Sequence, residues 1–374
     1  MLCRFENRLT QQALVLEDYQ GQATVTHAAE LADFYAAIRR AQSKGWWTAL
    51  VLDYEAGWLF IDPPSGLPHP TQPVMRALFF AQPHMGSPWG APTSAATLRA
   101  QLNTSKSAYL ATLARIREDL HQGEYYQVNY TVELAVQACA SPEHIYRQIA
   151  NQHPTAYAVY LDDGQRQIAS FSPELFVQHQ DQRLRVKPMK GTRPRFLDPA
   201  SDQASAQALR QSAKDCAENI MIVDLLRNDL GQLATPGSVQ PHALLEVEQY
   251  PSVWTMTSTI EAHCAQASLE QVLPALFPCG SITGAPKRAA MHALHQYEQR
   301  ARGIYCGSLG WLAPNGDFEL NVTIRTLEFN EAGQARFGVG GGIVYDSDPE
   351  QEWEEIFWKA RLLGCPIEYQ PASS

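Results

Sequence analysis

A basic segment in the middle of the chain is the first place where the residue types could do chemistry. Residues 186–195 read VKPMKGTRPR, which puts four cations into ten residues of a chain with a formal net charge of −10. The alternating run before this segment predicts a strand, and the glycine and prolines within it predict a turn. Lys190 can point into a cleft there, because Gly191 beside it lets a backbone approach a ligand. A solvated basic turn is the simpler interpretation of these ten residues alone.

Glu174 is a candidate general acid. It follows the turn signal of Ser172 and Pro173 and precedes an apolar run that is typical of a strand. Because a carboxyl group in apolar surroundings has a raised pKa, such a glutamate can hold a proton near neutral pH and donate it. On its own this pattern is a weak signal.

A helical stretch at residues 214–229 carries a second candidate carboxyl group. Lys214 and Glu218 are four residues apart, and they share a face with the apolar Ile222 and Leu225. Glu218 should therefore be partly buried. A buried carboxylate needs a partner, which the lysine or a metal ion could provide.

The last predicted helix, which begins at Pro349, repeats this pairing. Glu352, Glu355 and Lys359 fall at i, i+3 and i+7 and so lie on one face. Two glutamates from separate helices would make a Mg²⁺ site that water and an anionic substrate complete. Surface salt bridges are the alternative, and periodicity alone favours them.

Two glycine-rich segments could bind an anion or admit a ligand. Residues 277–287 (FPCGSITGAPK) form a loop that runs into a helix, where free backbone N–H groups bind anions. The loop lacks the order of a Walker motif, so a carboxylate is as good a guest as a phosphate. Residues 338–343 (GVGGGI) lie in a predicted strand, where so many glycines imply close approach by a ligand or another backbone. A strand at 125–134 places Gln127 and Asn129 on one face, toward solvent or a cleft.

The composition excludes several classes of function. A chain of 374 residues with 45% hydrophobic content can bury one large or two ordinary cores. Its acidic balance argues against a nucleic-acid binder, and no run approaches the roughly 18 apolar residues of a membrane span. Seven scattered cysteines without a Cys-x-x-Cys pair indicate neither a zinc site nor a disulfide framework. We therefore expect reduced thiols, a cytoplasmic location and, if a metal is bound, oxygen ligands.

Mixed strands and helices must position these residues. Residues 1–103 form an N-terminal portion of short apolar strands and loops without a candidate catalytic residue. A region rich in proline, glycine, serine and threonine, from residue 82 to about 105, is its soft boundary. Residues 104–370 carry all the candidates described above and are predicted to form the catalytic part.

Taken together, these segments resemble the chorismate-utilising enzyme family over roughly residues 105–366. The order and spacing of the shared segments make the match specific; they are residues 126–129 (YQVN), 171–174 (FSPE), 190–195 (KGTRPR), 214–229, 280–287 (GSITGAPK), 324–326 (IRT), 340–343 (GGGI) and 352–359 (EWEEIFWK). The resemblance implies an α+β fold like that of the large component of anthranilate synthase. In that fold two packed, mostly antiparallel sheets with outer helices surround a deep cleft.

The resemblance also implies how individual residues bind chorismate and a metal. Glu218 and Glu355 match the Mg²⁺-binding glutamates, with Glu352 acting through water. The ion would hold the ring carboxylate, which explains how an acidic protein binds a dianion. Tyr305 and Arg325 match the residues that grip the enolpyruvyl carboxylate. The further substrate-binding positions are Gln127, Thr192, Lys214, Thr283, Gly284, Gly340, Gly341, Gly342 and Lys359.

Two positions decide which reaction the resemblance implies. Family members that add water to chorismate carry a lysine where this chain has Gln127, so an ammonia-using synthase is implied. Anthranilate synthases carry a small residue where this chain has Lys190, and Lys-Gly-Thr is typical of members that aminate chorismate at C4. The implied product is 4-amino-4-deoxychorismate, a precursor of 4-aminobenzoate and folate. The alternatives are the formation of anthranilate and a subunit that only binds chorismate.

In the implied mechanism Lys190 is a covalent nucleophile at C2 of chorismate, and Glu174 is the general acid for the C4 hydroxyl group. Ammonia then adds at C4 and expels the lysine. Lys190 must first lose its proton, which burial or nearby cations such as Lys187, Arg193 and Mg²⁺ would favour. The chain has no room for a glutaminase domain, so we expect a separate glutamine amidotransferase subunit to supply ammonia.

Overall fold

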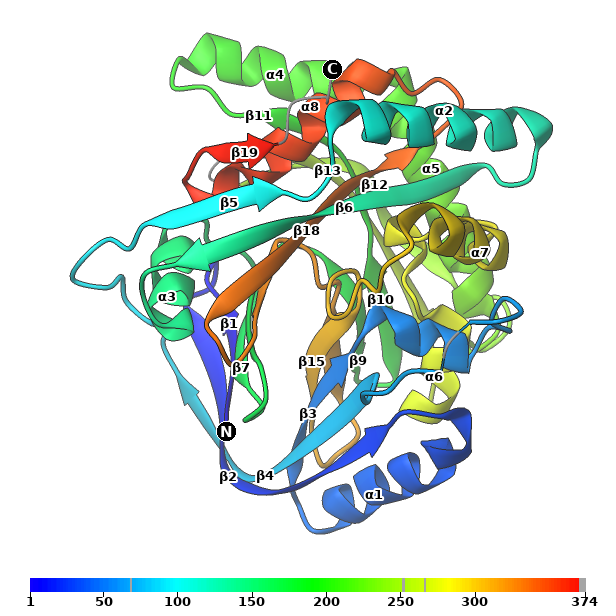
Figure 1. The fold of residues 1–374 in the computed structure, drawn as a ribbon. Coiled ribbons are helices and arrows are strands. Elements are labelled where there is room, and N and C mark those ends of the chain that lie inside the picture. Colours follow the sequence, from blue (N-terminus) through cyan, green and yellow to red (C-terminus); the bar gives the residue numbers. More distant parts are fainter. Residues whose placement is uncertain (68, 251–252, 266, 370–374) are drawn as a thin grey trace.

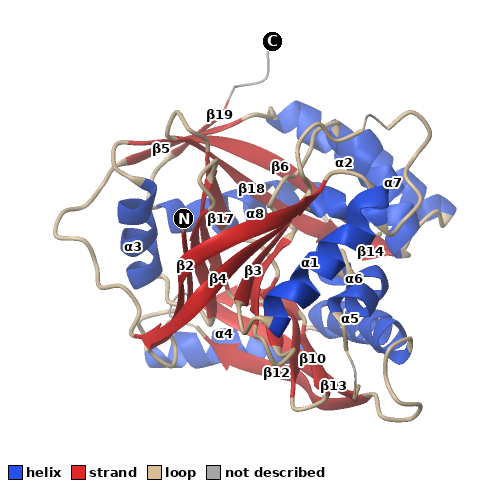
Figure 2. Ribbon diagram, turned by 90° about the horizontal axis from the view of Figure 1, so that it is seen from below, coloured by secondary structure: helices blue, strands red, loops and turns tan. Residues whose placement is uncertain are grey.

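The strands of this protein pair almost entirely antiparallel, and the sheet that they form dominates the computed structural model (Figure 1). The structure describes residues 1–67, 69–250, 253–265 and 267–369. Residue 370, the predicted end of the catalytic part, lies outside the described residues. Figure 2 shows that the strands run through the middle of the molecule and that the helices lie outside them.

The described strands and helices occupy the following positions. The strands are β1 (Leu2–Asn7), β2 (Gln12–Val25), β3 (Trp47–Leu52), β4 (Met75–Gly86), β5 (Leu98–Leu102), β6 (Gln127–Ala138), β7 (Tyr157–Asp162), β8 (Gln167–Ser172), β9 (Leu175–Gln180), β10 (Arg183–Lys187), β11 (Met189–Pro194), β12 (Gln240–Gln249), β13 (Val253–His263), β14 (Gly284–Ala285), β15 (Ser308–Leu312), β16 (Phe318–Asn321), β17 (Thr326–Phe329), β18 (Gln334–Ile343) and β19 (Ile367–Tyr369). The α-helices are α1 (Leu31–Ser43), α2 (Lys106–Gln122), α3 (Pro142–Gln152), α4 (Pro199–Gln211), α5 (Ala213–Gly231), α6 (Leu269–Leu276), α7 (Lys287–Glu298) and α8 (Pro349–Ala360). The 3₁₀ turns are η1 (Ala28–Glu30), η2 (Tyr54–Leu59), η3 (Gly280–Ile282) and η4 (Arg361–Leu363).

One path of antiparallel neighbours joins most of the strands. It runs β5–β6–β18–β17–β8–β7–β1–β2–β4–β3–β15–β16–β9–β10–β13. β13 also pairs with β11 and β12, β14 pairs with β6, and β19 pairs parallel with β5. The predicted α+β class is confirmed. The sequence predicted two sheets. They correspond to the two arms of this path, one with β5, β6 and β18 and the other with β9, β10 and β13, and β7, β1 and β2 connect the arms.

Three apolar cores hold this arrangement together. The inner core lies within the curved middle of the path, where Phe5, Leu78 and Leu161 belong to one cluster. A second core packs α1, α5 and α6 against the arm that contains β9, β10 and β13. A third core packs α2, α3, α7 and α8 against the arm that contains β5, β6 and β18. The space that carries the candidate residues therefore lies between two arms, each braced by its own helices.

The N-terminal residues supply strands to both arms. β1 pairs with β7, β3 pairs with β15, and β5 pairs with β6. Strands from residues 1–103 are therefore interleaved with strands from the rest of the chain, and the division at residue 103 stays a prediction.

Strand β6 explains how one segment serves a core and a cleft at once. Val128, Tyr130 and Val132 belong to the core beneath the helices. Because side chains alternate along a strand, Gln127 and Asn129 project from the opposite face. The polar face predicted from the alternation is thus turned toward the interior of the molecule, since both side chains are buried.

Local signals set the helix ends. The Ser105 hydroxyl accepts a hydrogen bond from the Ala108 N–H at the start of α2, and Gly123 ends that helix in the left-handed conformation. A serine at the start and a glycine at the end are the residue types that favour these two positions. Within the part of the chain that the structure describes, no helix combines the length and the apolar character that a membrane crossing requires.

A buried arginine ties α7 to both β6 and the loop after α6. Arg302 pairs with Glu298 at 2.8 Å, and the exposed fractions of the two side chains are 1% and 3%. Its guanidinium also donates to the carbonyl oxygens of Ile282, at 3.0 Å, and Asn129, at 2.7 Å. These bonds fix the 280–287 loop against the strand that carries Gln127.

Replacing Arg302 by methionine should therefore destabilise the protein strongly. The change leaves the Glu298 carboxylate buried without its counter-ion, and removing one partner of a buried pair costs about 3–5 kcal/mol. Urea unfolding followed by circular dichroism would measure the loss. Arg288→Met is the matched control, because Arg288 pairs with Asp62 where the two side chains are 65% and 80% exposed, and it should cost less than about 1 kcal/mol. Equal losses in the two variants would contradict this account.

Candidate active site

Lys190 lies in a strand, whereas the sequence predicted a turn at this point. The chain passes from β10 through Pro188 into β11, and both strands pair with β13. The pairing register shifts between Met189 and Thr192, and Gly191 within that interval has a φ of +87°. A β-bulge of this kind turns a side chain away from its regular direction. The glycine was thus a correct signal of unusual backbone, but of a bulge and not of the end of the strand.

The bulge brings Lys190 to the glycine strand β18, beside the amide of Gln127. A Cβ atom on Gly342 would lie 2.6 Å from Lys190 Nζ and 2.8 Å from Gln127 Nε2. Gly342 itself pairs with Asn129 across β18 and β6. The close approach expected at the glycine strand is therefore made by two polar side chains from different strands.

Two buried side chains on β6 and beside it carry polar atoms without a hydrogen-bond partner among the described residues. The Gln127 side chain is fully buried, and neither its Oε1 nor its Nε2 is bonded. The Thr283 hydroxyl is in the same condition. Thr283 and Gly284 lie next to β6, because the Asn129 N–H donates to the Thr283 carbonyl at 2.9 Å and Gly284 pairs with Val128. Since buried polar groups in folded proteins are nearly always bonded, these groups are suited to a polar ligand or to water.

Glu174 is a buried acid within electrostatic reach of Lys190. Its exposed fraction is 3%, and its Oε1 accepts a hydrogen bond from Ser281 Oγ at 2.7 Å. Burial raises the pKa of Glu174 to about 7, although the Ser281 hydrogen bond and the Lys190 charge act in the opposite direction. A carboxyl group with such a pKa can donate a proton at neutral pH.

The glutamates of α8 face the same glycine strand. A Cβ atom on Gly341 would lie 3.0 Å from Glu352 Oε2 and 3.3 Å from Glu355 Oε1. Glu355 forms an ion pair with Lys359, and Lys359 Nζ donates to the Gly340 carbonyl at 2.6 Å. Lys190 and the carboxylates of α8 thus approach neighbouring glycines of the same strand.

Glu218 completes the group from α5. Its Oε1 lies 3.9 Å from Lys214 Nζ, as the i, i+4 spacing predicted. Burial raises the pKa of Glu218, and the charges of Lys190 and Lys214 oppose this rise. Burial would also raise the pKa of Glu355, but the Lys359 charge and hydrogen bond, with Lys190 and Lys214, hold it below its ordinary value. Lys190 is therefore electrostatically linked to carboxylates on two separate helices.

The donor set fits a Mg²⁺ ion in its chemistry. Among the described residues no three metal-ligating side chains stand together as a ready group. Mg²⁺, however, is usually held by one or two carboxylates together with waters and an anionic substrate. Glu352 and Glu355 supply two carboxylates at one point above Gly341, and Glu218 is close enough for its charge to interact with that of Glu355. Lys359 and Lys214 balance these charges in the structure described here.

Arg325 and Tyr305 lie in different surroundings. Arg325 lies between β16 and β17 and has a φ of +52°. Burial lowers the pKa of Arg325, while the charges of Tyr250 and Glu174 oppose this. The Tyr305 ring instead packs against Gly338, where a Cβ atom would lie 2.1 Å from Tyr305 Cδ1. Arg325 is thus associated with the acid Glu174, and the shared role of Arg325 and Tyr305 stays a prediction.

Thr192 stands apart from the other predicted positions. Its side chain is exposed, and its hydroxyl lies 3.3 Å from that of Thr255 on the neighbouring strand β13. Its role in binding a substrate also stays a prediction.

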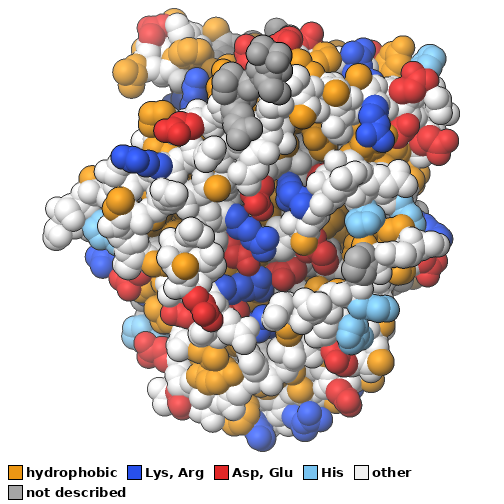
Figure 3. All heavy atoms as spheres, viewed as in Figure 1, with side chains coloured by type: hydrophobic (Ala, Val, Ile, Leu, Met, Phe, Trp, Pro, Cys, Tyr) orange, Lys and Arg blue, Asp and Glu red, His pale blue; other side chains and the backbone are white. Residues whose placement is uncertain are grey.

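A charge network that the sequence did not indicate crosses the strands elsewhere. Arg166 pairs with Asp53 at 3.0 Å and with Glu328 at 2.9 Å, and Arg336 pairs with Glu328 at 2.9 Å. Figure 3 shows acidic and basic side chains gathered together in the hollow at the middle of one face, where neither sign dominates. The opposite charges of Arg166, Asp53 and Glu328 neutralise one another, which fits a structural role for this network.

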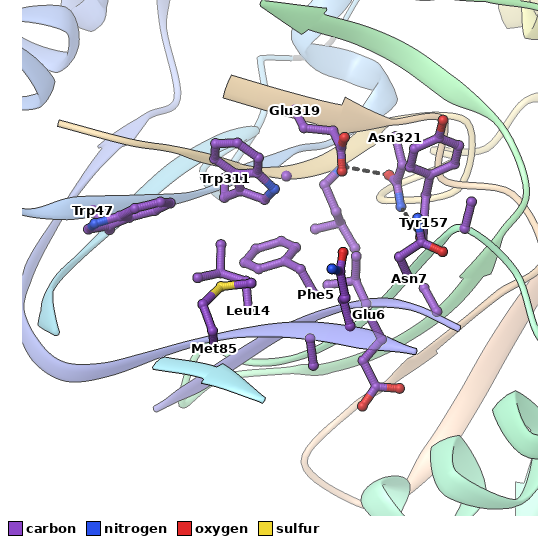
Figure 4. A pocket seen from close by; sticks show the side chains of 17 residues that line it. Phe5, Glu6, Asn7, Leu14, Trp47, Met85, Tyr157, Trp311, Glu319 and Asn321 are labelled. Atoms are coloured by element: carbon purple, nitrogen blue, oxygen red, sulfur yellow. Dashed lines mark hydrogen bonds between the residues drawn. The ribbon is translucent and has the colours of Figure 1, made fainter. Parts of the chain in front are cut away.

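A cavity of about 320 Å³ lies between β1, β2, β7, β15 and β16, away from the glycine strand (Figure 4). Trp311, Glu319 and Asn321 are among its lining residues, and Asn321 Nδ2 donates to the Tyr157 carbonyl at 3.0 Å. Burial raises the pKa of Glu319 to about 7. Of the described residues that line this cavity, none is a predicted site residue. Glu319 therefore offers a half-buried glutamate with a raised pKa, as Glu174 has, but away from Lys190 in its contacts.

Replacing Gly342 by alanine should displace the two side chains that meet there. The new methyl group would stand 2.6 Å from Lys190 Nζ and 2.8 Å from Gln127 Nε2, so both must move from their positions. Because misplacing a reacting group by about 1 Å can cost about 10²-fold in rate, we expect a loss of that order in kcat. Gly231→Ala is the matched control, since no atom lies within 4 Å of its added Cβ. Full activity of the Gly342 variant would show that Lys190 is not used in this position.

Titratable side chains from several strands and helices thus converge on a strand that only glycines leave open. The chain belongs to the chorismate binding enzyme family, which it matches over residues 4–363.

Named relatives within this family show which proteins the chain is similar to. The chain is 39% identical over 271 residues to aminodeoxychorismate synthase component 1 of Salmonella typhimurium, which covers 72% of this chain and 59% of that protein. It is 35% identical over 299 residues to anthranilate synthase component 1 of Thermus thermophilus, which covers 79% of this chain and 64% of that protein. The chain thus spans about six-tenths of the length of these relatives.

Two solved structures share the fold. Anthranilate synthase component I from Streptococcus pneumoniae superposes with a TM-score of 0.81 at 20% identity, over 95% of this chain and 92% of that one. MenF, the menaquinone-specific isochorismate synthase from Escherichia coli, superposes with a TM-score of 0.75 at 19% identity, over 97% and 87% of the two chains. At this level of identity the likeness concerns the fold alone, and it agrees with the architecture predicted from the sequence.

Proposed function

We propose that this protein aminates chorismate to 4-amino-4-deoxychorismate, as component 1 of an aminodeoxychorismate synthase. The observation that carries the proposal is the meeting of Lys190 Nζ and Gln127 Nε2 over Gly342, with the acid Glu174 in electrostatic reach. A lysine nucleophile with a neutral amide beside it suits amination, whereas hydration would need a base for water in the place of Gln127. The relative from Salmonella typhimurium that bears the same name supports this assignment.

In the first step of the proposed mechanism the neutral amine of Lys190 attacks C2 of chorismate. The two ring double bonds shift, the C4–O bond breaks, and Glu174 gives its proton to the departing hydroxyl group, which leaves as water. In the second step ammonia adds at C4, the double bonds shift back, and the bond between C2 and Lys190 breaks. The side chain of Lys190 is thereby regenerated.

The attack requires that Lys190 first lose a proton. Lys187 and Arg193 were expected to help by repulsion, but Lys187 pairs with Glu248 at 2.6 Å and Arg193 with Asp215 at 3.3 Å. Their charges are largely taken up by these partners. Of the three cations expected to favour the neutral amine, the proposed Mg²⁺ ion is therefore the one that is left.

Mg²⁺ is the cofactor that the proposal requires. Glu218 and Glu355 would hold it, with Glu352 acting through water, and it would supply positive charge to the ring carboxylate of chorismate. The other carboxylate of the substrate would be bound by Arg325 with help from Tyr305 and the N–H groups of the glycine strand. Lys214 and Lys359, which pair with the glutamates, would then be released toward the substrate.

The Glu218→Gln variant tests the metal assignment. Loss of one carboxylate charge should weaken Mg²⁺ binding by about tenfold or more, because a hard cation prefers charged oxygen ligands. Calorimetric titration of Mg²⁺ into the protein with chorismate would measure this. Asp224→Gln, a change at the exposed Asp224 on the same helix, is the control. Unchanged binding in the Glu218 variant would refute the assignment.

Ammonia would come from a separate glutamine amidotransferase, as the name component 1 of the relatives suggests. We place the reaction in the cytoplasm, where the seven cysteines of the chain would stay reduced. In the presence of the partner, glutamine should replace ammonium salt as the nitrogen source. Without the partner, only ammonium salt should support turnover.

A product assay tests the proposal directly. The purified protein is incubated with chorismate, Mg²⁺ and ammonium salt, and the products are separated by chromatography. We expect a product that an aminodeoxychorismate lyase converts to 4-aminobenzoate. Direct formation of fluorescent anthranilate would establish the alternative that the Thermus thermophilus relative represents, and the absence of any reaction would leave only a binding role.

A further inference from the structure

We infer that Ser281 is a positioning residue for Glu174: its hydroxyl holds Oε1 and so assigns the transferable proton to Oε2. The inference rests on the proposed function, in which this proton is transferred to the departing hydroxyl group. Ser281 belongs to a segment that sequence analysis singled out as an anion-binding loop, and no role followed for its hydroxyl group. The two residues are 107 positions apart in the chain, so only the fold brings them together.

The contact is direct and buried. Ser281 Oγ donates to Glu174 Oε1 at 2.7 Å, and the exposed fraction of each residue is 3%. The serine hydroxyl has a single proton to donate. Cys279 Sγ lies on its other side, at 3.2 Å from Ser281 Oγ, and the thiol can donate to the hydroxyl oxygen. This gives a chain of donors that runs from the thiol through the hydroxyl to the carboxyl group.

The direction of the hydrogen bond from Ser281 to Glu174 decides which oxygen of Glu174 carries the proton. While Oε1 accepts the hydrogen bond from Ser281, it cannot also carry a proton that points along the same line. On this geometry the acid proton lies on Oε2. Without Ser281 either oxygen could be protonated, and part of the population would carry the proton on the wrong oxygen.

The main chain around Glu174 is already held, so the freedom that remains is that of the side chain. Ser281 restrains it together with a hydrogen bond from the Met189 backbone. The Glu174 N–H donates to Ser172 Oγ at 3.2 Å, and the Glu174 carbonyl accepts from the Val322 N–H at 3.0 Å. The loop of Ser281 is held as well, since a Cβ atom on Gly280 would lie 2.4 Å from Leu225 Cδ2 and the Ile282 carbonyl is bonded to Arg302. Fixed backbones on both sides let these two contacts orient the acid.

The hydrogen bond also affects the pKa of Glu174. A donor favours the charged carboxylate and so lowers the pKa that burial raises. Removing the hydroxyl should therefore raise the pKa further. The other titratable groups that interact with Glu174 are Lys190, Tyr250, Cys279 and Arg325, and all of them remain in the variants considered below.

The first experiment compares Ser281→Ala, Ser281→Thr and the wild-type protein in the chorismate and ammonium assay over a range of pH. For the alanine variant we expect kcat to fall about tenfold with little change in KM, and the alkaline limb of kcat/KM to move up by about one pH unit. Threonine keeps the hydroxyl and should restore both. Ser308→Ala is the matched control, because Ser308 is a fully buried serine that donates to the Asn321 carbonyl at 2.6 Å. A wild-type alkaline limb in Ser281→Ala, or no restoration by threonine, overturns the inference.

A second experiment needs no substrate and so separates this inference from the proposed function. Infrared difference spectra recorded during a pH titration contain the C=O band of protonated Glu174, which is identified by its loss in Glu174→Gln. In Ser281→Ala the band should shift in frequency, and its titration midpoint should rise. If wild-type protein does not convert chorismate but this band responds as expected, the proposed function fails and the contact stands. An unchanged band overturns the inference whatever the activity, and Ser281→Cys, with its weaker donor, is examined if the alanine variant does not fold.

Discussion

Lys190→Ala is expected to lower the formation of 4-amino-4-deoxychorismate by on the order of 10³-fold or more. The variant cannot form the covalent intermediate, because without the amine ammonia would have to displace the C4 hydroxyl group of chorismate directly. Binding of chorismate and Mg²⁺ should be largely retained, because the glutamates, Arg325 and the glycine strand remain. Steady-state kinetics and calorimetric titration of chorismate would measure the two quantities separately.

Lys187→Ala is the matched control for this prediction. Lys187 lies three residues earlier, in β10, and its ammonium pairs with Glu248 at 2.6 Å. It should lose little activity, since its charge is taken up outside the cleft. If Lys190→Ala turned over at the wild-type rate, Lys190 would not be the nucleophile. If both variants lost activity equally, the effect would come from the strand and not from the amine.

The second large effect is expected from Glu174→Gln, which should reduce kcat by about 10²–10⁴-fold. Glutamine has nearly the same shape and can still accept the hydrogen bond from Ser281, but it has no acidic proton for the departing hydroxyl group. Substrate binding should change little. Rates in single-turnover experiments would report the chemical step.

Glu319→Gln is the control that the structure offers for a carboxyl group with a raised pKa. Burial raises the pKa of Glu319 to about 7, as it does for Glu174. Glu319 lines the separate cavity between the strands, and its Oε2 accepts from Gln178 Nε2 at 2.9 Å. Its replacement should leave kcat within about twofold. A loss as large as that of Glu174→Gln would indicate that the acid is not specific to the cleft.

The pH dependence of kcat/KM also tests whether Glu174 is the general acid. Because burial raises the pKa of Glu174 to about 7, the protonated form is present below that pH and is lost above it. The kcat/KM of the wild-type protein should therefore fall as the pH rises through about 7. The residual activity of Glu174→Gln should lack this limb, and its presence there would assign the limb to another group.

Features that depend on near neighbours in the chain could be predicted from the sequence. The i, i+4 approach of Lys214 to Glu218 and the polar face of β6 follow from helical or strand periodicity. These interactions join residues a few positions apart, so their geometry follows once the helix or strand forms. The ordered set of motifs also indicated the family, which the match over residues 4–363 confirms.

Only the tertiary structure decided how distant segments meet. Lys190 was expected in a turn, and the pairing of β10 and β11 with the same strand β13 places it in a bulge. Neither its meeting with Gln127 over Gly342 nor the bond from Ser281 to Glu174 could be inferred from spacing. Contacts of this kind depend on strand register and on the curvature of the whole sheet. Both are set jointly by the many apolar residues of the three cores. The sequence by itself determined which residues could react, and the packing of the two arms determined which of them face one another.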